Sequence, residues 1–239
     1  MRRNKLIIAI LFVILIGLLA VVAGQVFFSE NLNEGSQNIL VLAIDESEHR
    51  PGLGAVDMAF LVHLENGTIK NYTPVFPHGM THPTVQEPPE YQAAGAGQML
   101  LLHDSFYWED SQQDLKYAKE IVEYQSNGTV HVDAVVGVTT AAVDAIIQSA
   151  NPLDVNGEVF QVNGIDLIRE HDALYGGDMD RGEAVKLLAK ALSKAAKDPD
   201  KKSKMISAAM DQYSKGNIVV YPQAAFVKLV AIKGMDSIV

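Results

Sequence analysis

The chain has 239 residues, no cysteine and a formal net charge of −10 at pH 7. Without cysteine it forms no disulfide, has no thiol nucleophile and cannot build a cysteine-based zinc site. The acidic balance disfavours nucleic acid and anionic lipid headgroups as general partners, because both carry negative charge.

The N-terminal segment predicts a membrane anchor. Residues 6–28 carry no charge and are mostly apolar, and a basic tip, residues 1–5, precedes them. An α-helix needs about 20 apolar residues to cross a bilayer core, and positive charge stays on the cytoplasmic side. We therefore expect a transmembrane helix over residues 6–28, a linker over residues 29–37 and an extracytoplasmic domain over residues 38–239.

A cleaved secretory signal is the alternative interpretation of this segment. Val21-Val22-Ala23 before Gly24 is an acceptable cleavage site. However, the apolar stretch is longer than the usual core of a signal peptide, and no polar region precedes Ala23. We expect the segment to be retained, which places a single-pass protein in the cell membrane with its C-terminal domain outside.

Strands are expected over residues 38–44, 57–64, 69–75, 131–138 and 218–221, with a hairpin over 153–160. The first is a continuous apolar run, typical of a strand buried on both faces. Asn66-Gly67 favours a tight turn between the second and third strands. The stretch 74–89 contains five prolines and predicts an irregular surface loop.

Helices are expected over residues 111–124, 141–150, 164–172, 182–196, 201–213 and 224–232. Helices alternating with strands indicate an α/β fold with a mixed sheet. The sequons at Asn66, Asn71 and Asn127 are candidate N-glycosylation sites, although the Asn-Gly pairs at 66 and 127 are also good turn sequences.

Two aspartates stand where chemistry is expected. Asp45 directly follows the first buried strand, at the carboxyl end where α/β sheets place ligands, and Asp57 opens the next strand. If these strands are adjacent, both carboxylates meet at one sheet edge and could hold a divalent cation. The alternative is that Asp45 merely begins a turn.

Arginine is scarce outside the predicted cytoplasmic tip. Only Arg50, Arg169 and Arg181 occur there. The planar fork of arginine matches the oxygens of phosphates and carboxylates. These three side chains are therefore candidates for structural or ligand-binding roles.

The opening of the domain resembles that of the LytR-CpsA-Psr (LCP) envelope proteins. Residues 38–45 read NILVLAID and Asp57 follows Asp45 by twelve positions, similar to N-I-L-L-L-G-x-D followed by R-x-D-T-M in that family. The resemblance continues through residues 132–136, and Asp178–Arg181, DMDR, is similar to the D-x-x-R of the family.

A related envelope family, the domain of unknown function 4012 (DUF4012), resembles the chain still more closely. Its signature E-x-R-P-x-G-G is matched by Glu48–Gly54, EHRPGLG. Together the two resemblances extend over roughly residues 38–195.

The resemblance implies an LCP-like α/β/α sandwich that binds a polyprenyl-(pyro)phosphate-linked glycan with Mg²⁺ and transfers the glycopolymer to the cell wall. Carried over, Asp45 and Asp57 would be the catalytic and metal-binding residues. The residues implied at the phosphate are Arg50, Arg169, Asp178 and Arg181.

The departures from the LCP pattern concern positive charge. Ala55 stands where that family has an arginine, Pro77–Met80 replaces its P-R-D-T motif, Arg169-Glu170-His171 replaces its R-x-R pair, and Ala184 replaces a further arginine. Each lost arginine contact costs about 1.5–3 kcal/mol. We therefore expect an envelope glycopolymer-binding protein with weak or no catalysis. An active Mg²⁺-dependent transferase and a structural surface glycoprotein are the alternatives.

Overall fold

The computed structural model describes residues 35–66, 68–155, 158–161, 191–192 and 194–223. The chain forms two compact units. We name the described residues of 35–139 and 219–223 the sheet unit, and those of 140–218 the helical unit.

Several of the predicted elements lie wholly or partly outside these described ranges. The anchor over residues 6–28 and the helices over 164–172 and 224–232 lie outside the described residues, as does most of the helix over 182–196. Within the described ranges, no helix has the length and apolar character needed to cross a membrane.

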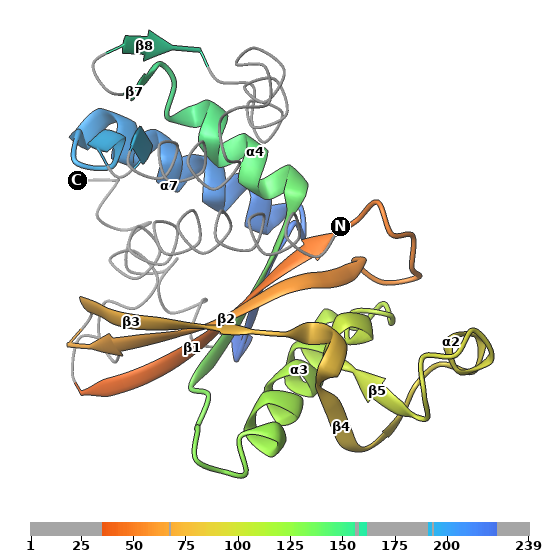
Figure 1. Ribbon diagram of the computed structural model, residues 1–239. Helices are drawn as coiled ribbons and strands as arrows, with labels where there is room; N and C mark the ends of the chain where they lie inside the picture. Colours follow the sequence, from red (N-terminus) through yellow and green to blue (C-terminus); the bar gives the residue numbers. More distant parts are fainter. Residues whose placement is uncertain (1–34, 67, 156–157, 162–190, 193, 224–239) are drawn as a thin grey trace, which may run out of the picture. The chain divides into compact units, whose positions relative to one another are not determined.

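A five-stranded mixed sheet forms the centre of the sheet unit (Figure 1), in the order β3-β2-β1-β6-β9. Strand β1 pairs antiparallel with β2 and parallel with β6, and β2 pairs antiparallel with β3. This confirms the predicted mixed α/β fold, whereas its three-layer form stays a prediction. The strands are β1 (Ser36–Asp45), β2 (Ala55–Glu65), β3 (Thr68–Val75), β6 (Ala134–Thr139) and β9 (Ile218–Tyr221).

Strand β1 is buried as its sequence predicts. All six residues of Ile39–Ile44 are at most 2% exposed. Helix α3 (Ser111–Gln125) packs on this sheet through Leu115, Ala118 and Ile121 (Figure 1). The carboxylate of Asp110 accepts hydrogen bonds from the first backbone N–H groups of α3, which fixes where this helix begins.

The prediction of an irregular loop over residues 74–89 is wrong. This stretch contains η1 (Pro77–Gly79) and β4 (Thr81–Gln86), and α2 (Pro89–Ala93) begins at its end. Strand β4 pairs with β5 (Met99–Leu101) at its two ends only, so its proline lies where no ladder bond is required.

A buried histidine supports β4 between those two pairings. The Nδ1 atom of His82 accepts the backbone N–H groups of Thr84 and Val85 at 3.1 and 2.9 Å. Its Nε2 atom lies 2.9 Å from the Glu120 carboxylate on α3. The side chain thus provides backbone hydrogen bonds that a neighbouring strand does not.

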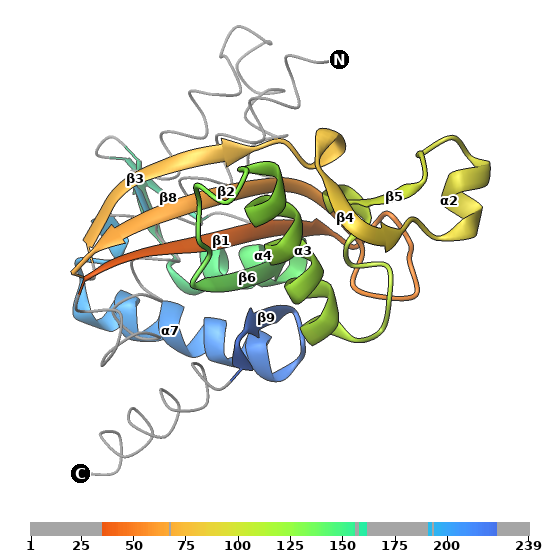
Figure 2. The same cartoon turned by 90° about the horizontal axis from the view of Figure 1, so that it is seen from below.

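The segment around β4 and β5 lies near the carboxyl end of β1, where Asp45 stands (Figure 2). Figure 2 shows β4, β5 and α2 toward the end of the sheet where β1 stops. A short 3₁₀ helix, η2 (Leu102–Asp104), follows β5 directly. This arrangement brings residues 87–104 to the edge of the sheet where Asp45 ends β1.

The helical unit contains α4 (Thr140–Ser149), the hairpin β7 (Leu153–Val155) and β8 (Glu158–Phe160), and α7 (Pro199–Ser214). Helix α4 packs on α7, and Asp198 caps α7, with Pro199 at its first position. The predicted hairpin and both helices are therefore confirmed, with bounds that shift by one or two residues.

Candidate functional site

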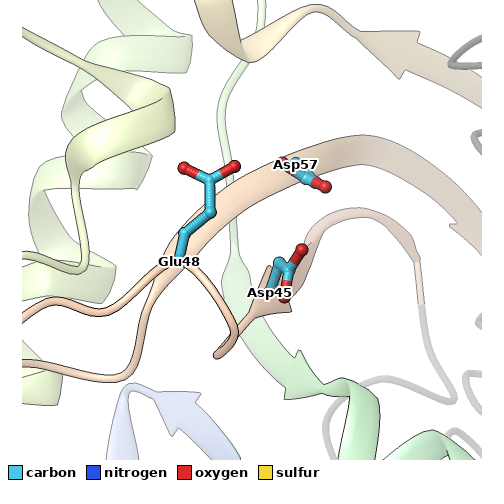
Figure 3. A group of neighbouring side chains, drawn as sticks. All are labelled: Asp45, Glu48 and Asp57. Carbon is cyan, nitrogen blue, oxygen red and sulfur yellow. The ribbon is translucent and has the colours of Figure 1, made fainter.

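Three carboxylates gather where β1 ends and β2 begins (Figure 3). Asp45, Glu48 and Asp57 each offer an oxygen atom, and these three oxygens lie within 4.8 Å of one another. Asp45 is half-buried, while the other two residues are exposed. The sheet thus brings together the two aspartates that the sequence placed at neighbouring strand ends.

A β-bulge directs Asp57 toward this group. Ala43 pairs with Met58, but the next residue of β1, Ile44, pairs with Val56, so Asp57 is the extra residue of the bulge in β2. Regular pairing would set Asp57 opposite Ile44, which belongs to the hydrophobic core. The extra residue turns the carboxylate out of that core, as bulges beside functional sites commonly do.

Asp45 also begins a turn, which was the alternative interpretation of its position in the sequence. Its Oδ1 atom accepts the backbone N–H of Ser47 at 2.8 Å. This local bond orients the carboxylate and starts the loop that returns the chain to β2. Asp45 therefore belongs both to the turn and to the carboxylate group.

The loop between the two strands carries a buried ion pair. The Nη2 atom of Arg50 donates to Oδ1 of Asp104, and only 5% and 6% of these side chains are exposed. The Nη1 atom lies 3.3 Å from Oε2 of Glu48, a carboxylate that is 47% exposed. Arg50 thus links the exposed carboxylate group to the interior of the sheet unit.

A second acid lies behind this ion pair. Glu87 is 1% exposed, and its Oε2 atom accepts the backbone N–H of Leu101 at 2.7 Å. Burial raises the pKa of Glu87 to about 8, and the closeness of Asp104 adds to this rise. Glu87 is therefore mainly protonated at pH 7, which leaves Asp104 as the buried counter-charge of Arg50.

Two histidines border the carboxylates. The Nδ1 atom of His103 lies 3.0 Å from the carbonyl oxygen of Val56. Since a carbonyl only accepts, Nδ1 carries a proton. The Nε2 atom lies 3.5 Å from Oε2 of Glu48, and the ring of His78 is 4.3 Å from that of His103.

The oxygen-rich group suits a hard divalent cation. Oxygens on opposite sides of a Mg²⁺ ion are about 4.2 Å apart, and those on opposite sides of a Ca²⁺ ion about 4.8 Å. The observed spread of the three carboxylate oxygens, within 4.8 Å, is compatible with either ion after small side-chain movements. Carboxylates are the preferred protein ligands of both.

The other predicted site residues either lie outside the described residues or are exposed asparagines. Arg169, Asp178 and Arg181 lie outside the described residues, so their part at a phosphate stays a prediction. The sequon asparagines Asn66, Asn71 and Asn127 are all exposed.

Two of these asparagines also make turns. Asn66 and Asn127 have φ values of 49° and 53°, a left-handed conformation that asparagine tolerates. The turn interpretation of both Asn-Gly pairs therefore holds, and glycosylation stays a prediction.

Sequence reasoning did not select Glu48 or Glu87 as site residues. The signal for Glu48 was present, since it opens the EHRPGLG stretch three residues after Asp45. Nothing in the sequence connects Arg50 with Asp104, 54 positions later.

The sequence matches, over residues 34–172, the family described as "Protein of unknown function (DUF4012)". No curated protein matches the chain.

Solved structures of LCP proteins are similar in fold. Protein gbs0355 from Streptococcus agalactiae has a TM-score of 0.51 at 14% identity, over 82% of this chain and 72% of that one. The transcriptional regulator yvhJ from Bacillus subtilis has a TM-score of 0.44 at 18% identity, over 78% and 70%. The structure "TagT bound to LI-WTA" has a TM-score of 0.38 at 15% identity, over 83% and 75%.

Proposed function

Because the chain belongs to the DUF4012 family and has a mixed α/β fold like that of LCP proteins, we propose that it is a membrane-anchored protein of the cell envelope. Its extracytoplasmic part binds a polyprenyl-(pyro)phosphate-linked glycan or a related glycopolymer. The observation that carries the proposal is the approach of Asp45, Glu48 and Asp57 within 4.8 Å.

A cation is central to this function because the ligand and the site are both negative. Mg²⁺ held by Asp45 and Asp57, with Glu48 beside them, would neutralise phosphate oxygens that the carboxylates alone would repel. The positions of these residues follow from the end of β1 and from the bulge in β2.

Apart from the cation, few residues could neutralise the negative charge of a bound phosphate. Arg50 is nearly buried and already contacts two carboxylates, so little of its charge is available to an incoming phosphate. Arg169 and Arg181 are the candidates that remain. This scarcity supports binding with weak or no turnover, since a transferase must also stabilise the charge of its leaving phosphate.

The test is calorimetric titration of the full-length protein, in detergent micelles, with a polyprenyl pyrophosphate. We expect binding that requires Mg²⁺ and is lost in Asp57→Asn, while Glu109→Gln, which removes an exposed carboxylate elsewhere in the sheet unit, binds normally. Binding that is equally strong in excess chelator would contradict the cation-dependent site.

The same preparation separates binding from catalysis. Release of the lipid pyrophosphate from a lipid-linked glycan, dependent on Mg²⁺ and absent in Asp57→Asn, would show an active transferase. Binding without such release is the result we expect.

A further inference from the structure

Arg50, in the loop between β1 and β2, is held by several contacts. Its guanidinium donates to Asp104 on one side and faces both the carboxylate and the carbonyl oxygen of Glu48, each at 3.3 Å, on the other. It also lies 5.3 Å from the centre of the Tyr91 ring, a distance at which a cation is attracted to the aromatic face.

The acid that holds Arg50 is itself fixed in the interior. Asp104 belongs to η2 and is 4% exposed. Burial raises the pKa of Glu87 behind it, and the guanidinium of Arg50 pairs directly with the Asp104 carboxylate. A matched pair of this kind resists movement, because separating the two would leave a buried charge without compensation.

The loop backbone is fastened to the same region. The N–H of Gly52 donates to the carbonyl oxygen of Tyr107 at 2.9 Å. A Cβ atom at position 52 would lie 2.0 Å from the carbonyl oxygen of Trp108, so only glycine allows this approach. Gly54, with φ of +133°, then brings the chain past Asp45 into β2.

These contacts hold the loop that carries the exposed carboxylate of Glu48. Arg50 holds its Oε2 atom from one side, and His103 approaches the same atom from another. The result is that a glutamate with a flexible side chain is set beside Asp45 and Asp57.

We propose that Arg50 is a positioning residue, which fixes Glu48 as the third carboxylate ligand of a divalent cation bound by Asp45 and Asp57. This inference rests on the cation site of the proposed function. It assigns roles within the stretch EHRPGLG: Glu48 is the ligand, Arg50 its anchor, and the glycines at 52 and 54 allow the close backbone contacts.

The test uses Mn²⁺ as a paramagnetic probe, with its affinity for the full-length protein measured by electron paramagnetic resonance. Residues that orient metal ligands typically contribute 10- to 100-fold to affinity. We expect Arg50→Gln and Glu48→Gln each to weaken Mn²⁺ binding by about tenfold or more, and Asp57→Asn to weaken it further. Lys116→Gln, which removes an exposed charge of α3, should bind like the wild type.

A double-mutant cycle separates positioning from a general loss of structure. If Arg50 acts through Glu48, adding Arg50→Gln to Glu48→Gln should cause little additional loss of affinity. Because Arg50→Gln alone leaves Asp104 unpaired, the double variant Arg50→Gln/Asp104→Asn is measured as well. It removes both buried charges and should show the same weakened binding, with thermal unfolding recorded in parallel.

The outcomes distinguish this inference from the proposed function. Wild-type Mn²⁺ affinity in the folded Arg50→Gln/Asp104→Asn variant, or in Glu48→Gln, would overturn the inference while leaving the envelope function intact. Loss of Mn²⁺ affinity as expected, in a protein that does not bind polyprenyl pyrophosphate, would support the inference and overturn the proposed ligand. A wild-type protein that binds no Mn²⁺ would overturn both.

Discussion

Arg50 and Asp104 form an ion pair inside the sheet unit, with 5% and 6% of their side chains exposed. Breaking a buried pair from one side is costly because the remaining charge stays in a medium of low dielectric constant. We expect Asp104→Ala to lower the free energy of unfolding by about 3–5 kcal/mol, measured by urea denaturation.

A surface pair provides the matched control. Lys194 and Asp154 lie 2.6 Å apart, with side chains 63% and 35% exposed. Such pairs contribute about 1 kcal/mol or less, so Asp154→Ala should have a much smaller effect. Similar losses in both variants would mean that the Arg50–Asp104 pair is solvated in the folded protein.

Asp114 on α3 should make the stability of the protein depend on pH. It is fully buried, and neither of its carboxylate oxygens makes a hydrogen bond with the described residues. Burial, together with the charge of Asp110, raises the pKa of Asp114 from 3.8 to about 8. The folded protein therefore keeps this carboxyl protonated at pH values where the unfolded chain ionises it.

The sign of the effect follows from this difference. Stabilisation by the raised pKa is fully present below pH 4 and is lost as the pH rises toward 8, at up to about 1.4 kcal/mol per pH unit. Between about pH 5 and pH 7, the free energy of unfolding of the wild type should fall by about 1–3 kcal/mol relative to Asp114→Asn. Glu87 shifts in the same direction but is present in both proteins, so its effect cancels.

The control for this pH series is Glu109→Gln, which removes an exposed carboxylate just before α3. Its stability should follow the wild type at every pH. Parallel pH profiles for the wild type and Asp114→Asn would show that Asp114 is ionised in the folded protein.

Gly52→Ala should disturb the loop that carries Glu48. The added Cβ would lie 2.0 Å from the carbonyl oxygen of Trp108 and 2.4 Å from that of Phe106, and backbone atoms cannot move aside as a flexible side chain can. Overpacking typically costs about 1–3 kcal/mol, so we expect a lower melting temperature and weaker Mn²⁺ binding.

Gly79→Ala is the matched comparison, because a Cβ atom at position 79 would meet nothing within 4 Å. That variant should retain both the stability and the Mn²⁺ affinity of the wild type. Unchanged Mn²⁺ affinity in Gly52→Ala would mean that Glu48 keeps its position without the close contact of the loop.

The proposed membrane topology predicts the result of limited proteolysis. Protease added to intact cells should digest the domain over residues 38–239 and leave a short membrane-bound fragment that contains residues 6–28. Protection of the domain until the cells are lysed would place it inside. A soluble product that begins near Gly24 would instead indicate cleavage of the N-terminal segment.

Much of the sheet unit could be predicted from the sequence, since its signals are local. The apolar run of β1 and the Asn-Gly turn between β2 and β3 depend on neighbouring residues only. The periodicity of α3 is equally local. By contrast, β4 was missed because five prolines in 74–89 favoured a loop, and its support comes from His82 and from β5, which lies elsewhere in the chain.

The sequence by itself determined that Asp45 and Asp57 stand near the adjoining ends of consecutive strands, because local apolar runs mark where these strands lie, although β2 begins two residues before Asp57, at Ala55. Only the tertiary structure decided that a bulge turns Asp57 out of the core, that Glu48 joins the two aspartates, and that Arg50 is held by Asp104. Burial and pairing between positions distant in the chain set the charge of each group and the direction of its side chain, and neither leaves a periodic pattern in the sequence.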